Sequence, residues 1–162
     1  MNPDIRTILY ATDLGPRGPE VFAHAAAIAR RFGAAIHIVH GVEPMGEFVH
    51  SLMDTYVPAE VLEELRQENL DQRHGEIQRR LEVFCRDELH TDTQESVKDV
   101  RVVEGRPERV ILDEAARLQA DMIVMGSRGH TALGEMLLGS VAHKVTLEAQ
   151  VPVLLVPLRP QS

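Results

Sequence analysis

Short runs of aliphatic residues recur at five places along the chain. They cover residues 8–11, 35–40, 100–103, 122–125 and 153–156. Four of the five lack a clean alternation of apolar and polar positions, which is typical of strands that are covered on both faces, as in a parallel sheet. The pattern therefore predicts five strands buried between helices.

Between these runs, apolar residues repeat every three or four positions, the spacing of one helix face. The first such repeat predicts a helix that starts near Pro16 and ends at Gly33. Another repeat lies within residues 58–89, a third follows Pro107 and the last precedes the final strand. The apolar residues that carry the four repeats are Phe22, Ala25, Ala29 and Phe32; Ile77, Leu81 and Phe84; Ile111, Ala115 and Leu118; and Leu138, Val141 and Val145.

Strands and helices therefore alternate in the order βαβαβαβαβ. Because crossovers between parallel strands are right-handed, this order predicts an α/β fold, a single doubly wound sheet with helices on both faces. The length of 162 residues suits one domain, which we expect to span residues 1–162. The connection over residues 46–58 is too apolar for a solvated linker; we expect a loop packed on its own domain, the alternative being a lid or a partner-facing loop.

The composition argues against several classes of protein. There are 17 Lys and Arg residues and 25 Asp and Glu residues, and the net charge of −8 argues against a dedicated DNA or RNA binder, which needs cationic contacts to phosphate. Cys85 is the only cysteine, so this chain alone forms no disulfide and no cysteine-based metal cluster. Neither a secretory signal nor an apolar run of about 20 residues is visible, so we expect a cytoplasmic protein without membrane partners.

The segment after the fourth predicted strand is the strongest candidate for a binding site, because open parallel sheets bind ligands beyond the carboxyl ends of their strands. Four glycines join this strand to a helix expected to begin near Ser140; they are Gly126, Gly129, Gly134 and Gly139. Glycine permits positive φ or close approach, a serine can cap the helix, and the remaining free amides attract an anion. We interpret the segment as a phosphate cradle without a lysine. The alternative is a flexible connection, against which the apolar residues 136–138 argue.

Two better-known phosphate motifs are missing. Gly134 and Gly139 have the spacing of a P-loop, but Ser140 stands at the position of the lysine and Val141 at that of the hydroxyl residue. After the first strand, residues 13–18 read Asp-Leu-Gly-Pro-Arg-Gly and lack the dinucleotide fingerprint G-x-G-x-x-G. The sequence therefore predicts neither P-loop hydrolysis nor a dinucleotide dehydrogenase.

Asp13, directly after the first predicted strand, has two interpretations. Its carboxylate could accept hydrogen bonds from ribose hydroxyls or hold a metal that phosphates carry. It could equally cap the helix expected near Pro16, as aspartate often does. The residue by itself does not decide between them.

The histidines predict no metal site. His37 and His40 lie three apart in a strand and so point to opposite faces. His130 and His143 have no carboxylate at ligand spacing, and His130 either pairs with phosphate or stays solvated. There is no G-x-S-x-G elbow, and Cys85 is expected to be a packing residue because it lies far from any strand end.

Taken together, these segments resemble the universal stress protein family, specifically its ATP-binding branch. The resemblance rests on residues 8–13, on residues 37–44 and on residues 121–127. Its most specific part is the motif G-x2-G-x9-G-[S/T], met by Gly126, Gly129, Gly139 and Ser140. The resemblance covers nearly the whole chain. It implies a five-stranded sheet of order 3-2-1-4-5, of the adenine nucleotide alpha hydrolase-like type, with the first and fourth strands side by side.

The resemblance also implies a ligand, ATP, accompanied by Mg²⁺ or Mn²⁺ on its phosphates, with ADP and AMP as related ligands. In the family, the aspartate matching Asp13 contacts the ribose, backbone beside the position of Gly41 recognises adenine, and the glycine segment lines the ribose and phosphates. The residues expected to line the ATP site are Ala11, Thr12, Asp13, Gly41, Val42, Gly126, Arg128, Gly129, His130, Gly139, Ser140 and Val141. Gly41 replaces the family's branched apolar residue, so we expect weakened base selectivity, whereas Arg128 adds positive charge that favours phosphate.

Members of the family commonly form homodimers through the last strand, which here spans Pro152 to Pro157. Flanking prolines suit an edge strand. The resemblance therefore implies a homodimeric, nucleotide-dependent module of the stress response. Hydrolysis is expected to be slow at most, because no side chain is evident as a base or as a cation for the γ-phosphate. The alternatives are an interaction module of the same fold that binds no nucleotide, and an enzyme that uses ATP to activate a substrate.

Overall fold

The computed structural model describes residues 3–43, 96–128 and 138–158, with scattered positions between 55 and 83. Its elements are β1 (Thr7–Ala11), α1 (Gly18–Phe32), β2 (Ala35–Val42), β3 (Val97–Glu104), α5 (Pro107–Leu118), β4 (Met122–Gly126), α6 (Ser140–Glu148) and β5 (Val153–Val156). The described positions from 59 to 83 are helical, as predicted. The predicted apolar residues Ile77, Leu81 and Phe84, with Cys85 and most of the 46–58 connection, lie outside the described residues.

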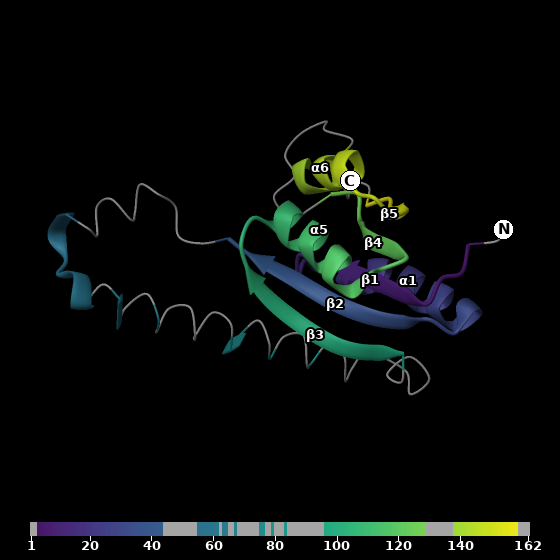
Figure 1. Ribbon diagram of the computed structural model, residues 1–162, viewed down its shortest axis with the longest axis horizontal. Helices are drawn as coiled ribbons and strands as arrows, with labels where there is room; N and C mark the ends of the chain where they lie inside the picture. The colour runs from purple at the N-terminus through teal and green to yellow at the C-terminus, as the bar shows by residue number, and fades with distance from the viewer. Residues whose placement is uncertain are drawn as a thin grey trace.

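The five strands form one parallel sheet in the order β3-β2-β1-β4-β5 (Figure 1). This confirms the predicted fold and strand order. β1 lies in the centre, where Ile8 pairs with Ile36 of β2 and with Met122 of β4. β3 begins earlier than predicted and includes Lys98 and Asp99, because one side of an edge strand meets no other strand and tolerates polar residues.

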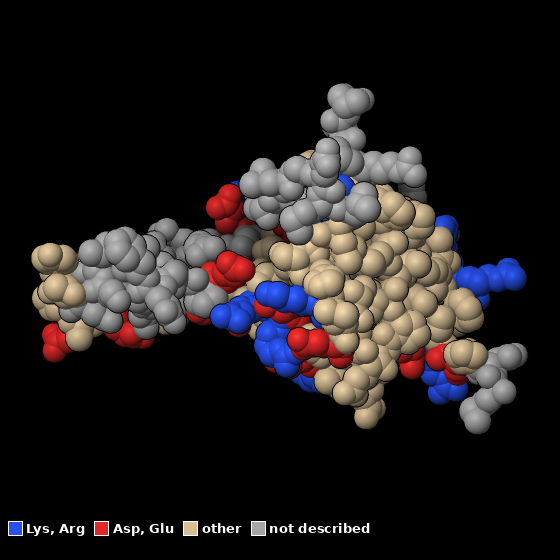
Figure 2. Space-filling model, turned by 90° about the horizontal axis from the view of Figure 1, so that it is seen from above, with Lys and Arg blue, Asp and Glu red and all other residues tan. Residues whose placement is uncertain are grey.

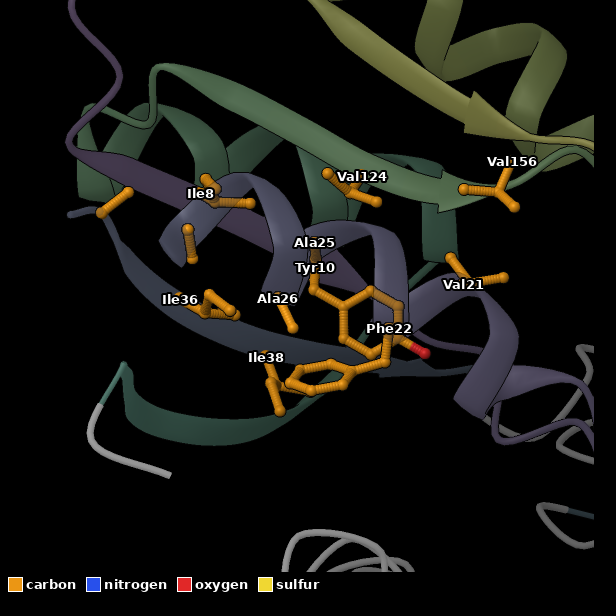
Figure 3. Close-up of a cluster of buried hydrophobic side chains, with 12 residues drawn as sticks. Ile8, Tyr10, Val21, Phe22, Ala25, Ala26, Ile36, Ile38, Val124 and Val156 are labelled. Atoms are coloured by element: carbon orange, nitrogen blue, oxygen red, sulfur yellow. The ribbon is translucent and has the colours of Figure 1, made fainter. Parts of the chain in front are cut away.

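Helices cover both faces of the sheet, α1 on one and α5 with α6 on the other (Figure 1). Because side chains alternate along a strand, β1 supplies both cores: Ile8 and Tyr10 pack on the α1 side, Leu9 and Ala11 on the other. On the α1 side, the ring of Tyr10 meets the ring of Phe22 edge-on at 5.3 Å between centroids (Figure 3). The central strand is thus buried from Ile8 to Ala11, between the two layers of helices.

The ends of α1 differ from the prediction at one end only. Gly33 ends the helix in the left-handed conformation, with φ of 65°, as predicted. The helix starts at Gly18 rather than near Pro16, because side-chain hydrogen bonds fold the preceding residues into a turn. Phe32, predicted to be part of the buried stripe, is half exposed because it lies in the last turn, where the chain leaves the helix.

Ion pairs hold α5 against its neighbours at both ends. Near its carboxyl end the buried Glu114 carboxylate accepts from Arg101 of β3 at 2.7 Å and from Arg117 at 2.9 Å. Towards the other end, Arg109 pairs with Glu148 of α6 at 2.8 Å. These contacts attach α5 to the edge strand and to α6. Within the part of the chain that the structure describes, no helix is long and apolar enough to cross a bilayer.

Candidate functional site

The carboxyl ends of β1, β2 and β4 lie at the same edge of the sheet. β1 lies between β2 and β4, so the connections that leave β1 and β4 run to opposite sides of this point. Such a reversal of strand order is where open α/β sheets bind ligands. The residues that follow these strands, together with the start of α6, therefore form the candidate site.

Thr12 holds the loop that leaves β1 through all three of its polar groups. Its amide donates to the Val39 carbonyl at 3.0 Å, and its carbonyl lies 2.7 Å from Nδ1 of His40. Its hydroxyl oxygen accepts from the Leu14 amide at 3.0 Å, in a turn where Leu14 takes a φ of 61°. A leucine in this left-handed conformation is strained, and the hydrogen bonds around Thr12 stabilise it.

Tyr10 extends this hydrogen-bonded chain into the core. Its buried hydroxyl donates to the Gly18 carbonyl at 3.0 Å and is also hydrogen-bonded to the Thr12 side chain. Burial raises the pKa of Tyr10 to about 12; the hydrogen bond from Thr12 opposes the shift and the charge of Asp13 adds to it. The phenol therefore stays neutral at physiological pH and joins β1 to the first turn of α1.

Asp13 does not cap α1, so the capping interpretation is wrong. Its Oδ1 accepts from the Gly15 amide at 2.8 Å, a local turn, and the residue that precedes α1 is Arg17, without a side-chain cap. The reason is that the turn moves the start of the helix to Gly18, too far along the chain for the Asp13 side chain to cap it. Asp13 itself is exposed at the carboxyl end of β1.

Ser127 joins three elements on the other side of the site. Its amide donates to the Val156 carbonyl at 2.9 Å, and its hydroxyl oxygen accepts from the Leu158 amide at 3.0 Å. Its carbonyl accepts from the Gly139 amide at 2.8 Å. Ser127 thus ties the end of β4 to β5 and to the start of α6. Sequence reasoning missed this residue, although it stands beside the first glycine of the motif.

The start of α6 departs from the prediction in one respect. Gly139, not Ser140, occupies the capping position, and no side chain caps the helix, so the predicted serine cap is wrong. The reason is that α6 already includes Ser140 as its first helical residue. The first helical hydrogen bond runs from the His143 amide to the Gly139 carbonyl at 2.8 Å. The amides of Ser140, Val141 and Ala142 precede it and have no acceptor within the helix.

Neither Gly126 nor Gly139, the described glycines of the motif, has a positive φ. Gly139 has a φ of −65°, and Gly33 and Gly105 are the glycines of the described residues with positive φ. A Cβ added at Gly126 would lie 2.7 Å from a methyl group of Leu158, so glycine there lets the segment after β5 fold over the end of β4. Of the two explanations open from the sequence, close approach is the one that applies at Gly126.

Gly41 makes room for α5. A Cβ at this position would lie 3.0 Å from the Cα of Pro107 and 3.4 Å from the Cβ of Val110. The first turn of α5 therefore takes the space that a side chain at Gly41 would need. The backbone amide and carbonyl of Gly41 face β1. The Val39 carbonyl accepts from Thr12 on the β1 side, and the Val42 carbonyl accepts from Gly105 on the β3 side. Because the backbone groups of successive residues alternate between the two sides of a strand, those of Gly41 point to the same side as those of Val39.

Because β1 ends at Ala11, paired with Val39, the Gly41 amide and carbonyl point past its end. The predicted site residues lie at the carboxyl ends of three neighbouring strands and at the start of α6: Ala11 at the end of β1 with Thr12 and Asp13 after it, Gly41 and Val42 at the end of β2, Gly126 and Arg128 at and after the end of β4, and Gly139, Ser140 and Val141 at the start of α6. Gly129, His130 and Gly134 lie outside the described residues.

The strand histidines have separate partners on opposite faces, as their spacing predicts. His37 Nδ1 lies 2.6 Å from the Asp99 carboxylate, and His40 Nδ1 contacts the Thr12 carbonyl. Among the residues that the structure describes, no three His, Cys, Asp or Glu side chains come together as metal ligands. From the sequence, His40 is considered only as a metal ligand, and its contact with the loop that follows β1 is not predicted.

Comparisons with known proteins identify the family. The sequence matches the model of the universal stress protein family over residues 4–157. This chain belongs to the universal stress protein family. A universal stress protein of Thermus aquaticus is 36% identical over 151 residues, which cover 93% of this chain and 98% of the relative.

Solved structures of universal stress proteins share the fold. The universal stress protein UspA of Lactobacillus plantarum superposes with a TM-score of 0.76 at 21% identity and covers 96% of this chain and 99% of its own. A universal stress protein in complex with cAMP has a TM-score of 0.57 at 19% identity, with 95% and 98% covered. One from Archaeoglobus fulgidus in complex with dAMP has a TM-score of 0.52 at 22% identity, again with 95% and 98% covered.

Proposed function

We propose that this chain is an ATP-binding universal stress protein that acts as a nucleotide-dependent regulatory module in the stress response. ATP would lie across the carboxyl ends of β1 and β4, with its phosphates at the start of α6. The observation that carries this proposal is the hydrogen bond from the Gly139 amide to the Ser127 carbonyl. It anchors the start of α6 at the end of β4, so that the following amides lie at the edge where a ligand would enter.

The donors at this edge fit a phosphate chain. The amides of Ser140 and Val141 have no acceptor within the helix, and the helix dipole places about half a positive charge at this end. Arg128, which directly follows Ser127 at the end of β4, carries a full positive charge that would favour phosphate. We include Gly129 in the site through the motif, and the adjoining His130 as a residue that could pair with phosphate. Mg²⁺ or Mn²⁺ would accompany the nucleotide, bound to phosphate oxygens, and would neutralise part of their charge.

The other side of the site fits a nucleoside. The backbone amide and carbonyl of Gly41, turned past the end of β1, offer one donor and one acceptor to the edge of adenine, with Val42 adjoining. The exposed Asp13 carboxylate accepts hydrogen bonds, as ribose hydroxyls require. Ala11 and Thr12, which directly precede Asp13, would line the floor of this part of the site.

The nucleotide complexes of the structural neighbours support this assignment. The two neighbours bind cAMP and dAMP, which share an adenine base and one phosphate. The longer phosphate chain of ATP is our extension, and it rests on the amides at the start of α6. Hydrolysis would be slow, because no described side chain at this edge is evident as a base for the attacking water. Binding itself would then carry the signal.

We further propose that residues 1–162 form one cytoplasmic domain and that two copies pair through β5. β5 is an edge strand. The carbonyls of Pro152 and Val156 accept from Ile123 and Ser127 on the β4 side, so the alternation along the strand turns the backbone polar groups of Val153 and Leu155 outward. Leu147 of α6 is 72% exposed. Seen from above, the end of the molecule where β5 lies shows a broad surface with few charged side chains (Figure 2). Such an edge suits pairing with a second copy.

The dimer is tested by sedimentation of Val153→Pro. Proline at the start of an edge strand is tolerated, but it removes one outward amide. We expect the variant to keep its circular dichroism spectrum and to dissociate at about 30-fold higher concentration than the original protein, the equivalent of two lost hydrogen bonds, one from each copy. An unchanged dissociation constant would exclude pairing through β5.

Nucleotide binding is tested on the purified protein. Denaturation followed by mass spectrometry identifies any bound small molecule, and calorimetry of the stripped protein measures its affinity for ATP and for AMP. Absence of nucleotide and of binding heat would favour the interaction module, and repeated turnover with a second substrate would favour an enzyme.

The phosphate cradle is tested by Gly139→Val, which places a branched side chain beside the first free amides. We expect it to abolish ATP binding while the fold remains, because a φ of −65° suits any residue. The control is Gly75→Val, at a glycine whose Cβ position is open. If Gly139→Val binds ATP as tightly as the control, the phosphates lie elsewhere.

A further inference from the structure

His40 contacts the loop of the proposed site without being part of its predicted set. It lies in β2, one residue before Gly41, and its Nδ1 is 2.7 Å from the carbonyl oxygen of Thr12. A carbonyl oxygen has no proton, so the ring nitrogen donates. This bond spans 28 positions of sequence and joins the end of β2 to the residue that precedes Asp13.

The bond fixes more than one atom. The Thr12 carbonyl and the Asp13 amide belong to one planar peptide group, so holding the oxygen sets the direction in which the chain enters Asp13. The Thr12 amide is held at the same time by the Val39 carbonyl at 3.0 Å. Val39 and His40, consecutive residues of β2, thus hold the amide and the carbonyl of Thr12, the residue that follows β1.

The Asp13 side chain is fixed from the other direction. Its Oδ1 accepts from the Gly15 amide, and the Thr12 hydroxyl oxygen accepts from the Leu14 amide. The orientation of the carboxylate therefore depends on how the peptide between Thr12 and Asp13 is turned. The His40 ring supplies the side-chain hydrogen bond that holds the oxygen of this peptide.

We propose that His40 is a positioning residue for the nucleotide: through the Thr12 carbonyl it orients Asp13 and so determines affinity for the ribose. This inference rests on the proposed function, because it assigns the ribose to Asp13. His40 itself touches no part of the nucleotide in this arrangement. Loss of its hydrogen bond frees the peptide to rotate and turns the carboxylate away from the ribose hydroxyls.

Two substitutions separate the hydrogen bond from the ring. In His40→Asn the amide nitrogen lies two bonds from Cβ, as Nδ1 does, so it can donate to the Thr12 carbonyl. In His40→Leu the donor is lost. We expect the dissociation constant for ATP to rise about tenfold in His40→Leu, the equivalent of one hydrogen bond, and to stay within about threefold in His40→Asn. His40→Gln, whose amide is one bond further out, replaces the leucine variant if that one fails to fold.

The ribose assignment is tested with 2′,3′-dideoxy-ATP, which lacks the hydroxyls that Asp13 would bind. We expect His40→Leu to bind this analogue as tightly as the original protein does. Combining His40→Leu with Asp13→Asn should cost no more ATP affinity than Asp13→Asn alone, because both changes remove the same interaction. A purely structural role would instead weaken ATP and the analogue equally, and asparagine would not rescue it.

The outcomes distinguish the two proposals. If the original protein binds neither ATP nor the analogue, the proposed function fails and this inference fails with it. If the original protein binds ATP, but His40→Leu (or its glutamine replacement) either binds it equally well or loses both nucleotides alike, the positioning role is wrong while ATP binding stands.

Discussion

The two sides of the candidate site are built from different groups. On the β1 side, side chains hold the loop: Tyr10, Thr12, Asp13 and His40 each contribute a polar atom to it. On the β4 side, the main chain of Ser127 accepts from Gly139 and donates to Val156, and a single hydroxyl adds one further bond. The β1 side is thus held by side-chain atoms, whereas the β4 side is held mainly by hydrogen bonds of the backbone.

This difference predicts how each side responds to substitution. A loop held by side-chain atoms weakens when a single oxygen or nitrogen is removed. A set of backbone amides keeps its donors whatever side chains surround it, but a bulky side chain placed beside them can block access to them. Four further experiments sharpen this comparison, from the largest expected effect to the smallest.

The largest effect concerns Tyr10 at alkaline pH. Its pKa is raised from 10.0 to about 12, so between these values the unfolded chain loses the phenolic proton while the folded protein keeps it. The contribution of Tyr10 to the free energy of unfolding is therefore fully present below pH 10. It decreases by about 2–3 kcal/mol as the pH rises from 10 to 12. Urea unfolding of the original protein and of Tyr10→Phe measures the difference; parallel pH profiles would contradict the shift.

Tyr10→Phe at neutral pH has the next largest effect. The ring still packs against Phe22, but the Gly18 carbonyl and the Thr12 hydroxyl lose their partner. We expect a loss of about 1–2 kcal/mol in the free energy of unfolding and weaker ATP binding. The matched control is Tyr56→Phe, whose side chain is 80% exposed and should leave both quantities unchanged. Equal behaviour of the two variants would show that the hydroxyl does not hold the loop.

Ser127→Ala tests the other side of the comparison. It removes the bond from the Leu158 amide but leaves the backbone bonds to Val156 and Gly139. We expect a loss of about 1 kcal/mol in stability and an ATP affinity within about threefold of the original. A tenfold loss of affinity would mean that the phosphate side also depends on a side chain.

The smallest effect is expected for Arg109→Met, at the ion pair between α5 and α6. Both Arg109 and Glu148 are more than half exposed, so water and salt screen their attraction. We expect a change of about 0.5 kcal/mol or less in the free energy of unfolding, smaller still in high salt, and unchanged ATP affinity. A marked loss of binding would show that helix contacts, rather than Ser127, position the start of α6.

Much of the fold could be predicted because its signals are local. The aliphatic runs mark all five strands, and Gly33 and Pro107 mark helix ends because their backbone preferences act within a turn. Phe32 was misplaced because periodicity does not show where a helix stops covering the sheet. The glycine motif indicated the candidate site for a different reason: at Gly126 the glycine reflects the close approach of Leu158, a contact between distant parts of the chain.

The sequence by itself determined the alternation of strands and helices and the place of the glycine-rich edge. Three contacts were decided only by the tertiary structure. The Ser127 carbonyl anchors the start of α6, the Asp13 carboxylate accepts from the Gly15 amide instead of capping α1, and the His40 ring holds the Thr12 carbonyl. The bonds from His40 to Thr12 and from Leu158 to Ser127 join residues 28 and 31 positions apart. The pattern of apolar and polar residues does not predict such pairs, because only the packing of neighbouring strands brings them within hydrogen-bond distance.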